Sequence, residues 1–364
     1  MTAVAVPSTI ADLLAYHRWA NRKLLHLCRP LSDAQLDREE PIGPGSLRKI
    51  LAHMWAGESV WLSRWKEVSP TAFPADETPT VDELDARYDM LHAAREGFLH
   101  EESPPDLSRV ISYRTFAGDA YSNPLTELLM HVVNHGVHHR AQAMYLLKLN
   151  GVTIPGGLDY IFYRIAVPTV KMPESARERM RGYGLEVGDS LLPAFRHAPE
   201  LVRLYFNYGD WAMDRLFDHS ASLDDPDLDR DFGMGMGTLR KTLLHIYDAE
   251  KWWRGNWRGE KRIFEKLPPE TTIAELHDLW NQGAGDRNAI LATKDPDGLA
   301  EPVTADFGAG PMVFRTGESM LQLGVHGTHH RAQAINMLRR LGVQTTPFDL
   351  VMFVRERDQG KASA

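Results

Sequence analysis

The sequence "NHGVHHRAQA" at residues 134–143 returns almost unchanged as "VHGTHHRAQA" at residues 325–334. Both copies hold three histidines in the same order, followed by Arg-Ala-Gln-Ala. A phrase this specific does not recur by accident. It indicates that the chain contains an internal duplication, and the other segments are interpreted on that basis.

A second pair of segments repeats at nearly the same distance. Residues 45–65, "GSLRKILAHMWAGESVWLSRW", align with residues 237–257, "GTLRKTLLHIYDAEKWWRGNW", so that His245 follows His53 by 192 positions. The two histidine phrases are 191 positions apart, which means that one residue is lost between the blocks. A period this long indicates a duplicated domain and not a solenoid, whose repeats are about 20–50 residues long.

The duplication sets the predicted domain boundaries. The first copy covers residues 1–166 and the second residues 199–364; towards their ends, Asp159 in "PGGLDYIFYR" pairs with Asp349 in "TPFDLVMFVR". Residues 167–198 have no counterpart after the second copy. Their prolines and glycines predict a linker, with a short helix in "ESARERMRGYG".

Each copy is predicted to fold mostly as helix, because apolar residues recur at three-and-four spacing. Before the last long helix, residues 108–123 alternate apolar and polar side chains and contain Gly118-Asp119, which predicts a short β-hairpin. Four long helices in each copy favour a four-helix bundle, so we expect an all-α protein of two tandem bundles. In the first copy the predicted helices cover residues 8–27, 45–66, 80–101 and 125–150.

The composition limits the classes of function. The 364 residues carry a net charge of −8, which offers no general attraction for nucleic acid or for an anionic membrane. No segment approaches about 18 consecutive apolar residues, so we expect no membrane partner. The single cysteine, Cys28, cannot form an internal disulfide, and the chain opens without a signal-peptide pattern. We therefore expect a cytoplasmic protein.

The repeated histidines have the spacing of metal ligands. Residues i and i+4 of a helix lie one turn apart on the same side, so His135 and His139 project next to each other. Two imidazoles at this spacing can bind one metal ion, and His53 from the second helix can supply a third ligand in the bundle core. Three imidazoles leave coordination positions open, as in catalytic sites. The second copy offers the same set as His245, His326 and His330.

Neighbouring residues on this helix either support a metal site or simply pack. Gln142 and Gln333 come seven residues after the first histidine of each pair, so they can orient a ligand, touch a substrate or contact another helix. His138 and His329 lie about 60° around the helix from the first ligand. They are candidates for supporting groups or for alternative ligands.

At two other positions near the histidines, the two repeats can be compared residue by residue. His131 becomes Gln322 in the second copy, so it lies outside the common set and can make the two pockets chemically different. Glu58 and Glu250 follow the helix-two histidine by five residues, about 140° around the helix. We expect them to have a structural role and not to act as general bases.

A histidine on the second helix, followed by an H-x3-H-R-x-Q phrase on the fourth, resembles the DinB/YfiT-like superfamily. The segment "YHRWANRKLL" at residues 16–25 is also similar to the first helix of that family. The resemblance covers residues 1–166 and 199–356. It implies bundles with an up-down-down-up helix order, and "KEVSPTAFPADETP" at residues 66–79 is long enough for the crossing that this order requires. The three-histidine site of the family falls on His53, His135 and His139, and again on His245, His326 and His330.

The same resemblance implies a function in outline. Relatives bind zinc, nickel or iron, so we expect up to two divalent ions per chain, and relatives include thiol S-transferases, isomerases and hydrolases. We expect a metal-dependent enzyme that activates a low-molecular-weight thiol as cosubstrate for S-transfer to a small electrophile. A hydrolase that uses a metal-bound water and a non-catalytic metal-binding scaffold are the alternatives, so it stays open whether the protein is an enzyme.

Many relatives form homodimers, which bears on assembly. The tandem chain is therefore predicted to be an intramolecular pseudo-dimer with pseudo-two-fold symmetry. Whether the chain itself is a monomer or a homodimer stays open.

Overall fold

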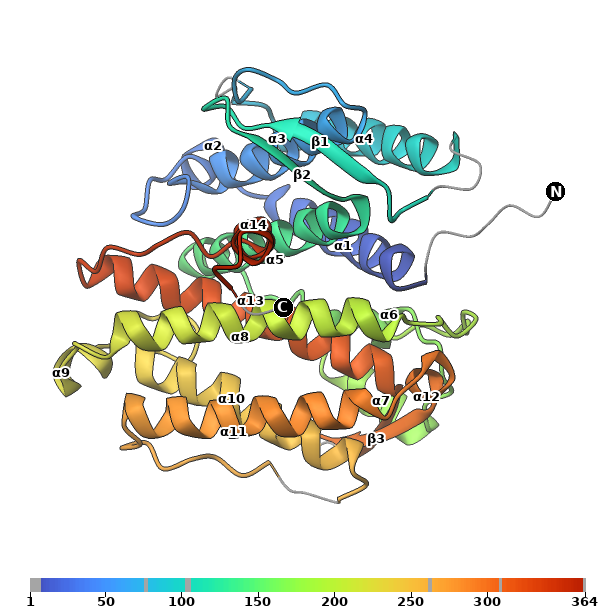
Figure 1. Ribbon diagram of the computed structural model, residues 1–364, viewed down its shortest axis with the longest axis vertical. Helices are drawn as coiled ribbons and strands as arrows, with labels where there is room; N and C mark the ends of the chain where they lie inside the picture. The colour runs from blue at the N-terminus through green and yellow to red at the C-terminus, as the bar shows by residue number, and fades with distance from the viewer. Residues whose placement is uncertain (1–7, 75–77, 102–105, 261–263, 308–309, 363–364) are drawn as a thin grey trace. The chain divides into compact units, whose positions relative to one another are not determined.

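The computed structural model describes residues 8–74, 78–101, 106–260, 264–307 and 310–362, and within them the chain is mostly helical (Figure 1). Two small antiparallel hairpins are the only sheets among these residues. The structure thus confirms the predicted all-α class with a hairpin in each copy. None of the described helices combines the length and the apolar character that a membrane span requires.

Contacts within the chain divide it into two compact units. Unit 1 comprises the residues up to Thr153 together with those from Phe348 onward, and unit 2 comprises Ile154–Pro347. Each unit is built around four long helices. In unit 1 these are α1 (Ser8–Cys28), α3 (Leu47–Trp65), α4 (Val81–Glu101) and α5 (Leu125–Leu149). In unit 2 they are α8 (Pro199–Ser220), α10 (Leu239–Trp257), α11 (Ile273–Ala292) and α13 (Thr316–Arg340).

The helices of unit 1 match the predicted ranges to within two residues, because local signals fix their ends. Thr80 and Glu83 form a reciprocal cap at the start of α4: the Thr80 backbone N–H donates to Glu83 Oε2 at 2.7 Å, and the Glu83 backbone N–H donates to Thr80 Oγ1 at 3.2 Å. At the end of α5, Gly151 stops the helix with a φ of 74°, a backbone conformation that favours glycine. Thr272 and Glu275 form the equivalent cap of α11 in unit 2.

The fourth long helix of each unit, α5 or α13, packs against two of the other long helices. In unit 1, α5 contacts both α1 and α3, and α4 closes the bundle against the same two helices. In unit 2, α13 contacts α8 and α10, and α11 takes the place of α4. The buried core of unit 1 includes Leu13, Leu24, Leu51, Leu84, Leu129 and Leu147.

The hairpins precede the last long helix of each bundle, as predicted. Strands β1 (Val110–Arg114) and β2 (Ala120–Pro124) pair with Tyr113 opposite Tyr121, and Gly118 turns the chain with a φ of 93°. Strands β3 (Pro302–Asp306) and β4 (Pro311–Arg315) repeat the arrangement in unit 2.

Shorter helices decorate the bundles. Two of them precede α3 and α10 and hold aspartates against a buried arginine: Arg48 Nε donates to Asp37 Oδ1 at 2.6 Å, and Arg240 Nε donates to Asp229 Oδ1 at 3.0 Å. These helices are α2 (Asp33–Leu36) and α9 (Asp225–Leu228), while α12 (Pro296–Ala300) precedes β3. The predicted linker contains α7 (Glu174–Gly182) and belongs to unit 2.

The terminal helix of each repeat lies in the unit formed by the other repeat. Helix α14 (Leu350–Asp358), at the end of the second repeat, packs on α5 in unit 1 (Figure 1). There Arg357 Nη1 donates to Glu127 Oε1 at 2.8 Å, and Asn123 Nδ2 donates to Asp358 Oδ2 at 2.9 Å. The compact units therefore change at Thr153 and Pro347, whereas the domain boundaries at 166 and 199 remain predictions based on the sequence duplication.

The end of the first repeat makes the reciprocal exchange. Helix α6 (Tyr160–Ala166) packs on α13 in unit 2. The Ile161 backbone N–H donates to Gln322 Oε1 at 2.7 Å, and Thr169 Oγ1 donates to the carboxylate of Glu318. Each bundle is thus closed by a helix that the sequence duplication assigns to the other copy.

We expect deletion of residues 348–364 to destabilise unit 1, although these residues belong to the second repeat. The deletion removes the buried side chains of Leu350, Val351, Phe353 and Val354, and each buried side chain of this kind contributes about 1.5–3 kcal/mol. Hydrogen exchange of the backbone amides should show faster exchange in α5 and little change in α13. Loss of protection in α13 with α5 unchanged would contradict the exchange of helices.

Candidate metal centres

Two clusters of three histidines form where the sequence analysis placed them. In unit 1, α3 contributes His53, and α5 contributes His135 and His139. One ring nitrogen of each lies within 4.8 Å of the other two, and His139 Nε2 is 3.1 Å from His135 Nε2. Two ligand nitrogens on a tetrahedral zinc ion are about 3.3 Å apart, so this spacing fits a metal ion of that size.

The second cluster has the same geometry. In unit 2, α10 contributes His245, and α13 contributes His326 and His330. His245 Nε2 is 3.2 Å from His326 Nε2, and the three ligand atoms again lie within 4.8 Å of one another. In the described part of the chain, no fourth His, Cys, Asp or Glu joins either cluster.

A glutamine orients one histidine of each triad. Gln142 Oε1 accepts a hydrogen bond from His139 Nδ1 at 2.9 Å, and Gln333 Oε1 accepts one from His330 Nδ1 at 2.7 Å. With the proton on Nδ1, the lone pair of Nε2 is left to face the other two rings, which is the arrangement that metal-ligating histidines usually have.

The other end of each glutamine amide explains the remaining histidines of the phrase. Gln142 Nε2 donates to His138 Nε2 at 3.0 Å, and Gln333 Nε2 donates to His329 Nε2 at 2.9 Å. The structure therefore places His138 and His329 behind the glutamines and outside the ligand clusters.

A glycine in the loop before α3, and another in the loop before α10, let these loops pack closely against the two glutamines. A Cβ on Gly43 would lie 2.1 Å from Gln142 Oε1, and a Cβ on Gly235 would lie 2.5 Å from Gln333 Oε1. Both glycines have positive φ, 50° and 55°. A larger residue would be strained there and would displace the amide that orients the ligand.

Burial keeps the imidazoles of the second triad, and that of His135 in the first, neutral. The pKa values of His135, His326 and His330 lie well below the usual value, first because burial disfavours the charged form and then because neighbouring imidazoles repel one another. Burial also lowers the pKa of His245. A metal ion binds only the neutral imidazole, so little proton release is needed on binding.

Asp159 is a charged neighbour of the second triad that the sequence analysis paired with Asp349 without giving it a role. It is half-buried at the N-terminus of α6, which the bond from Ile161 to Gln322 holds beside α13. Its carboxylate partly opposes the effect of burial on the pKa values of His245 and His330. The only sequence signal for it was its recurrence, because its approach to the triad depends on the helix exchange.

Exposed aromatic side chains flank both triads, and the sequence analysis missed them. In unit 1, Phe73 stacks on His53 with ring centroids 5.2 Å apart, and Phe116 packs edge-on against Phe73 at 6.0 Å. Their counterparts 191 residues later are Phe264, 6.4 Å from His245, and Phe307, which packs on Trp252 at 4.7 Å. The recurrence of both phenylalanines at the common offset was the available signal.

An open cavity adjoins the aromatic pair of unit 2. It has a volume of about 890 Å³ and runs between the end of α10 and the β3–β4 hairpin. Its lining includes Trp257, Phe264, Lys294, Thr304, Asp306 and Phe307. This space is large enough for a small organic molecule, and Phe264 connects it to the second triad because its ring also lies near His245.

A buried carboxylate lies behind each triad in an ion pair with an arginine of the third long helix. Glu58 accepts a hydrogen bond from Arg95 Nη1, and its Oε2 lies 3.0 Å from His17 Nε2. Glu250 Oε2 accepts from Arg287 Nη1 at 3.0 Å. Both carboxylates are therefore engaged in buried ion pairs, and their structural role stays a prediction.

The surrounding residues shift the pKa values of Glu58 and Glu250 in opposite directions. Burial alone would raise the pKa of Glu58, but Arg95 and His17 outweigh it and hold the pKa below its usual value. Burial raises the pKa of Glu250, and repulsion from the negative charge of Asp210 adds to this effect. Asp210 also shares Arg287, whose Nη2 is 2.5 Å from Asp210 Oδ2.

His131 and Gln322, which occupy the same position in the two repeats, make the surroundings of the two triads different. His131 is buried edge-on against Trp61, with ring centroids 5.0 Å apart, and burial lowers its pKa to about 3. Gln322, its counterpart, anchors Ile161 of α6. Neither residue belongs to a triad.

Comparisons with known proteins agree with this geometry. The sequence model of the DinB family matches residues 5–170 and 196–360. Protein DinB of Bacillus subtilis (strain 168) is 23% identical over 165 residues, which covers 44% of this chain and 95% of that protein. No solved structure matches the chain significantly.

We expect Gln333→Leu to weaken zinc binding by unit 2 by about 10–100-fold, because His330 loses the acceptor that orients it. The measurement is a competition titration in a chain whose first triad is removed by His53→Ala and His139→Ala. Gln282→Leu, on the exposed face of α11, is the matched control and should leave the affinity unchanged. Equal affinities for both variants would contradict the orienting role.

We expect Glu58→Gln to destabilise the protein more than Glu250→Gln at pH 7. Loss of the Glu58 charge leaves Arg95 buried and without its carboxylate, a defect of about 3–5 kcal/mol, whereas Arg287 keeps Asp210. Because the folded-state pKa of Glu58 is lowered, its contribution is complete above the usual carboxyl value of 4.5 and declines as the pH falls below it.

Urea unfolding at pH 7 and at pH 4 measures both effects. The difference between wild type and Glu58→Gln should be smaller at pH 4. Equal losses for the two variants at pH 7 would show that the opposite charge environments have no energetic consequence.

Proposed function

The chain belongs to the DinB family, with one family match in each repeat, and on this basis we propose that both triads bind a divalent metal ion. We further propose that the protein is a metal-dependent enzyme that transfers a low-molecular-weight thiol to an electrophile. The observation that carries the proposal is the convergence of three imidazoles in each unit with no fourth protein ligand in the described residues. A structural metal site is usually closed by four protein ligands, whereas an open position is typical of catalysis.

The residues present fit such an ion. Gln142 and Gln333 direct ring nitrogens towards the centres, and burial lowers the pKa values of His135 and His330. A divalent ion bound there would act as a Lewis acid that lowers the pKa of a thiol or a water. The donor set does not select among zinc, nickel and iron.

The aromatic flanks suggest the form of the substrate. Phe73 and Phe116 in unit 1, and Phe264 and Phe307 in unit 2, offer apolar surface beside the histidines. They suit a small molecule with an apolar body. In the transfer, the thiol gives up its proton, its sulfur forms a bond to an electrophilic carbon, and the leaving group departs with the electrons of the broken bond.

Hydrolysis of a small molecule is the second candidate, and Asp159 favours it. The influence of this half-buried carboxylate on His245 and His330 places a potential proton acceptor near the second triad. In that reaction a water would give up its proton and attack the substrate. An Asp159→Asn variant that lost hydrolysis but kept metal binding would support this alternative.

The cellular setting follows from the same proposal. A free thiol as cosubstrate requires a reducing compartment, and Cys28, the single cysteine, is buried as a free thiol. We therefore propose a cytoplasmic protein that acts on small molecules. The two repeats take the place of the two subunits of a dimer in this proposal.

We expect two metal ions per chain by elemental analysis, with one ion lost in His139→Ala and one in His330→Ala. His131→Gln is a suitable control, because it installs the residue that the second repeat already has at this position and should keep both ions. Absence of metal from every preparation, after reconstitution as well, would refute the metal-dependent function.

Cobalt in place of the natural ion then separates the two candidate reactions. If a thiol binds at the open position, it should produce a sulfur-to-cobalt charge-transfer band in the absorption spectrum. A chain that binds two cobalt ions but shows no such band with any small thiol would favour hydrolysis over thiol transfer.

A further inference from the structure

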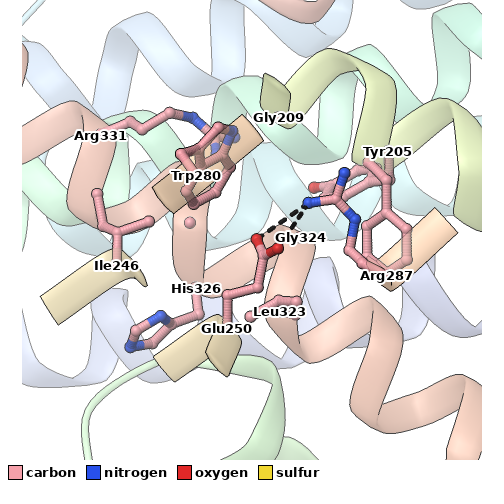
Figure 2. Close-up of a pocket in the computed structure, with 12 residues that line it drawn as sticks. Tyr205, Gly209, Ile246, Glu250, Trp280, Arg287, Leu323, Gly324, His326 and Arg331 are labelled. Atoms are coloured by element: carbon pink, nitrogen blue, oxygen red, sulfur yellow. Dashed lines mark hydrogen bonds and ion pairs between the residues drawn. The ribbon is translucent and has the colours of Figure 1, made fainter. Parts of the chain in front are cut away.

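A small cavity in unit 2 shares His326 with the second triad (Figure 2). It offers about 20 Å³ to the centre of a water molecule, and about 10–15 Å³ is enough for one. The residues that matter for its chemistry are Gly209, Glu250, Arg287, His326, Gly327 and Arg331.

In unit 1 a side chain fills the corresponding space. The alignment of the repeats places His17 at the position of Gly209. His17 Nε2 is 3.0 Å from Glu58 Oε2, and a Cβ on Gly136 would lie 2.4 Å from Cε1 of His17. The counterparts of these two neighbours, Glu250 and Gly327, both line the cavity of unit 2. The cavity is therefore the volume that the imidazole of His17 occupies in unit 1.

The same replacement changes the hydrogen bonding of a buried arginine. In unit 1, Arg140 Nη1 donates to Oδ1 of Asn21 at 2.7 Å and to Nδ1 of His17 at 3.2 Å. Both acceptors are side chains of α1. The guanidinium of Arg140 thus has acceptors on the side that faces this helix.

Arg331, the counterpart of Arg140, has lost both acceptors, because Gly209 replaces His17 and Met213 replaces Asn21. Arg331 Nη2 donates to Thr328 Oγ1 at 2.9 Å. Its Nη1 lies 3.6 Å from the point where a Cβ on Gly209 would stand, and no described residue accepts a hydrogen bond from it. Arg331 as a whole is buried and lines the cavity, so an acceptor in the cavity would satisfy this donor.

Nδ1 of His326 is the second polar atom that has no hydrogen-bond partner among the described residues. Its Nε2 is 3.2 Å from His245 Nε2, which leaves Nδ1 as the nitrogen not directed at the triad. No described residue hydrogen-bonds to Nδ1, whereas Nδ1 of His330 is held by Gln333. Figure 2 shows the ring of His326 on the same cavity as the carboxylate of Glu250, which is tied to Arg287.

We propose that this cavity binds one ordered water molecule, which accepts hydrogen bonds from Arg331 Nη1 and His326 Nδ1 and donates one to Glu250. Three partners are typical of a buried water. The water keeps the proton of His326 on Nδ1, so the lone pair of Nε2 faces the other two histidines. Glu250 is then a positioning residue that acts on His326 through the water. As far as it concerns metal binding, the inference rests on the proposed function.

Two substitutions at Gly209 test the water directly. This glycine has ordinary helical φ, and a Cβ there would make only van der Waals contact with Arg331, so Gly209→Ala should fold. Its methyl group takes the space of the water without offering a hydrogen bond. Gly209→Ser occupies the same space but supplies a hydroxyl that can replace the water.

The measurements use a chain without the first triad, through His53→Ala and His139→Ala. One readout is zinc affinity by competition titration, and the other is the tautomer of His326 from ¹⁵N–¹H spectra of the metal-free protein. Gly209→Ala should bind zinc about tenfold or more weakly and should lose the Nδ1-protonated tautomer. Gly209→Ser should restore most of the zinc affinity and most of the Nδ1-protonated tautomer of His326. Gly285→Ala, at a helical glycine with open space around it, is the control and should change neither.

The outcomes separate this inference from the metal function. Unchanged affinity and tautomer in Gly209→Ala would overturn the water, as would equal losses in the alanine and serine variants. If the parent chain binds no zinc, the proposed function fails for unit 2. The tautomer of His326 in the metal-free parent and in Gly209→Ala still decides whether the water is present.

Discussion

The hydrogen bond from a histidine Nδ1 to a glutamine Oε1 is the interaction on which both centres depend. It occurs at His139 with Gln142 and at His330 with Gln333, in each case three residues apart on one helix. Without it, a ring on a half-buried helix face can turn either nitrogen towards its neighbours. The glycines that close over the two glutamines show that the loop before the second long helix is shaped around this bond. The recurrence of the whole phrase "HHRAQA" follows from this requirement, since the ligand and the residue that orients it lie on the same turn.

Periodicity and duplication were sufficient to predict the long helices, the hairpins and the six triad histidines. Those features depend on local patterns: helical spacing, a cap such as Thr80 with Glu83, and a stop such as Gly151. The exchange of α6 and α14 could not be predicted, because both repeats carry the same terminal phrase and an alignment does not reveal which bundle a helix joins. Phe73 and Phe116 were missed for a related reason. They lie in loops, where no period identifies a functional side chain.

The two repeats have kept their histidine triads, whereas the charged residues around the buried carboxylates have diverged. Around Glu58 the protein places Arg95 and two imidazoles, His17 and His92. Around Glu250 it places two arginines, Arg287 and Arg254, and Arg287 is shared with a second carboxylate, Asp210. The two carboxylates therefore have different charged neighbours. Two identical sets of metal-ligating histidines can have different properties when the residues around them differ, because these neighbours fix the orientation and the basicity of the rings. The duplication has in effect given one chain two versions of the same centre.

The exchange of terminal helices has a consequence for synthesis on the ribosome. Domains of a nascent chain generally fold in order from the N-terminus. Here unit 2 is one continuous segment, Ile154–Pro347, whereas unit 1 requires residues from Phe348 onward to cover α5. The second bundle can therefore be complete while the first, although made earlier, still lacks its closing helix. Until α14 has been synthesised, the apolar face of α5 that it later buries is open to solvent, and nascent unit 1 exposes a surface that a chaperone can bind.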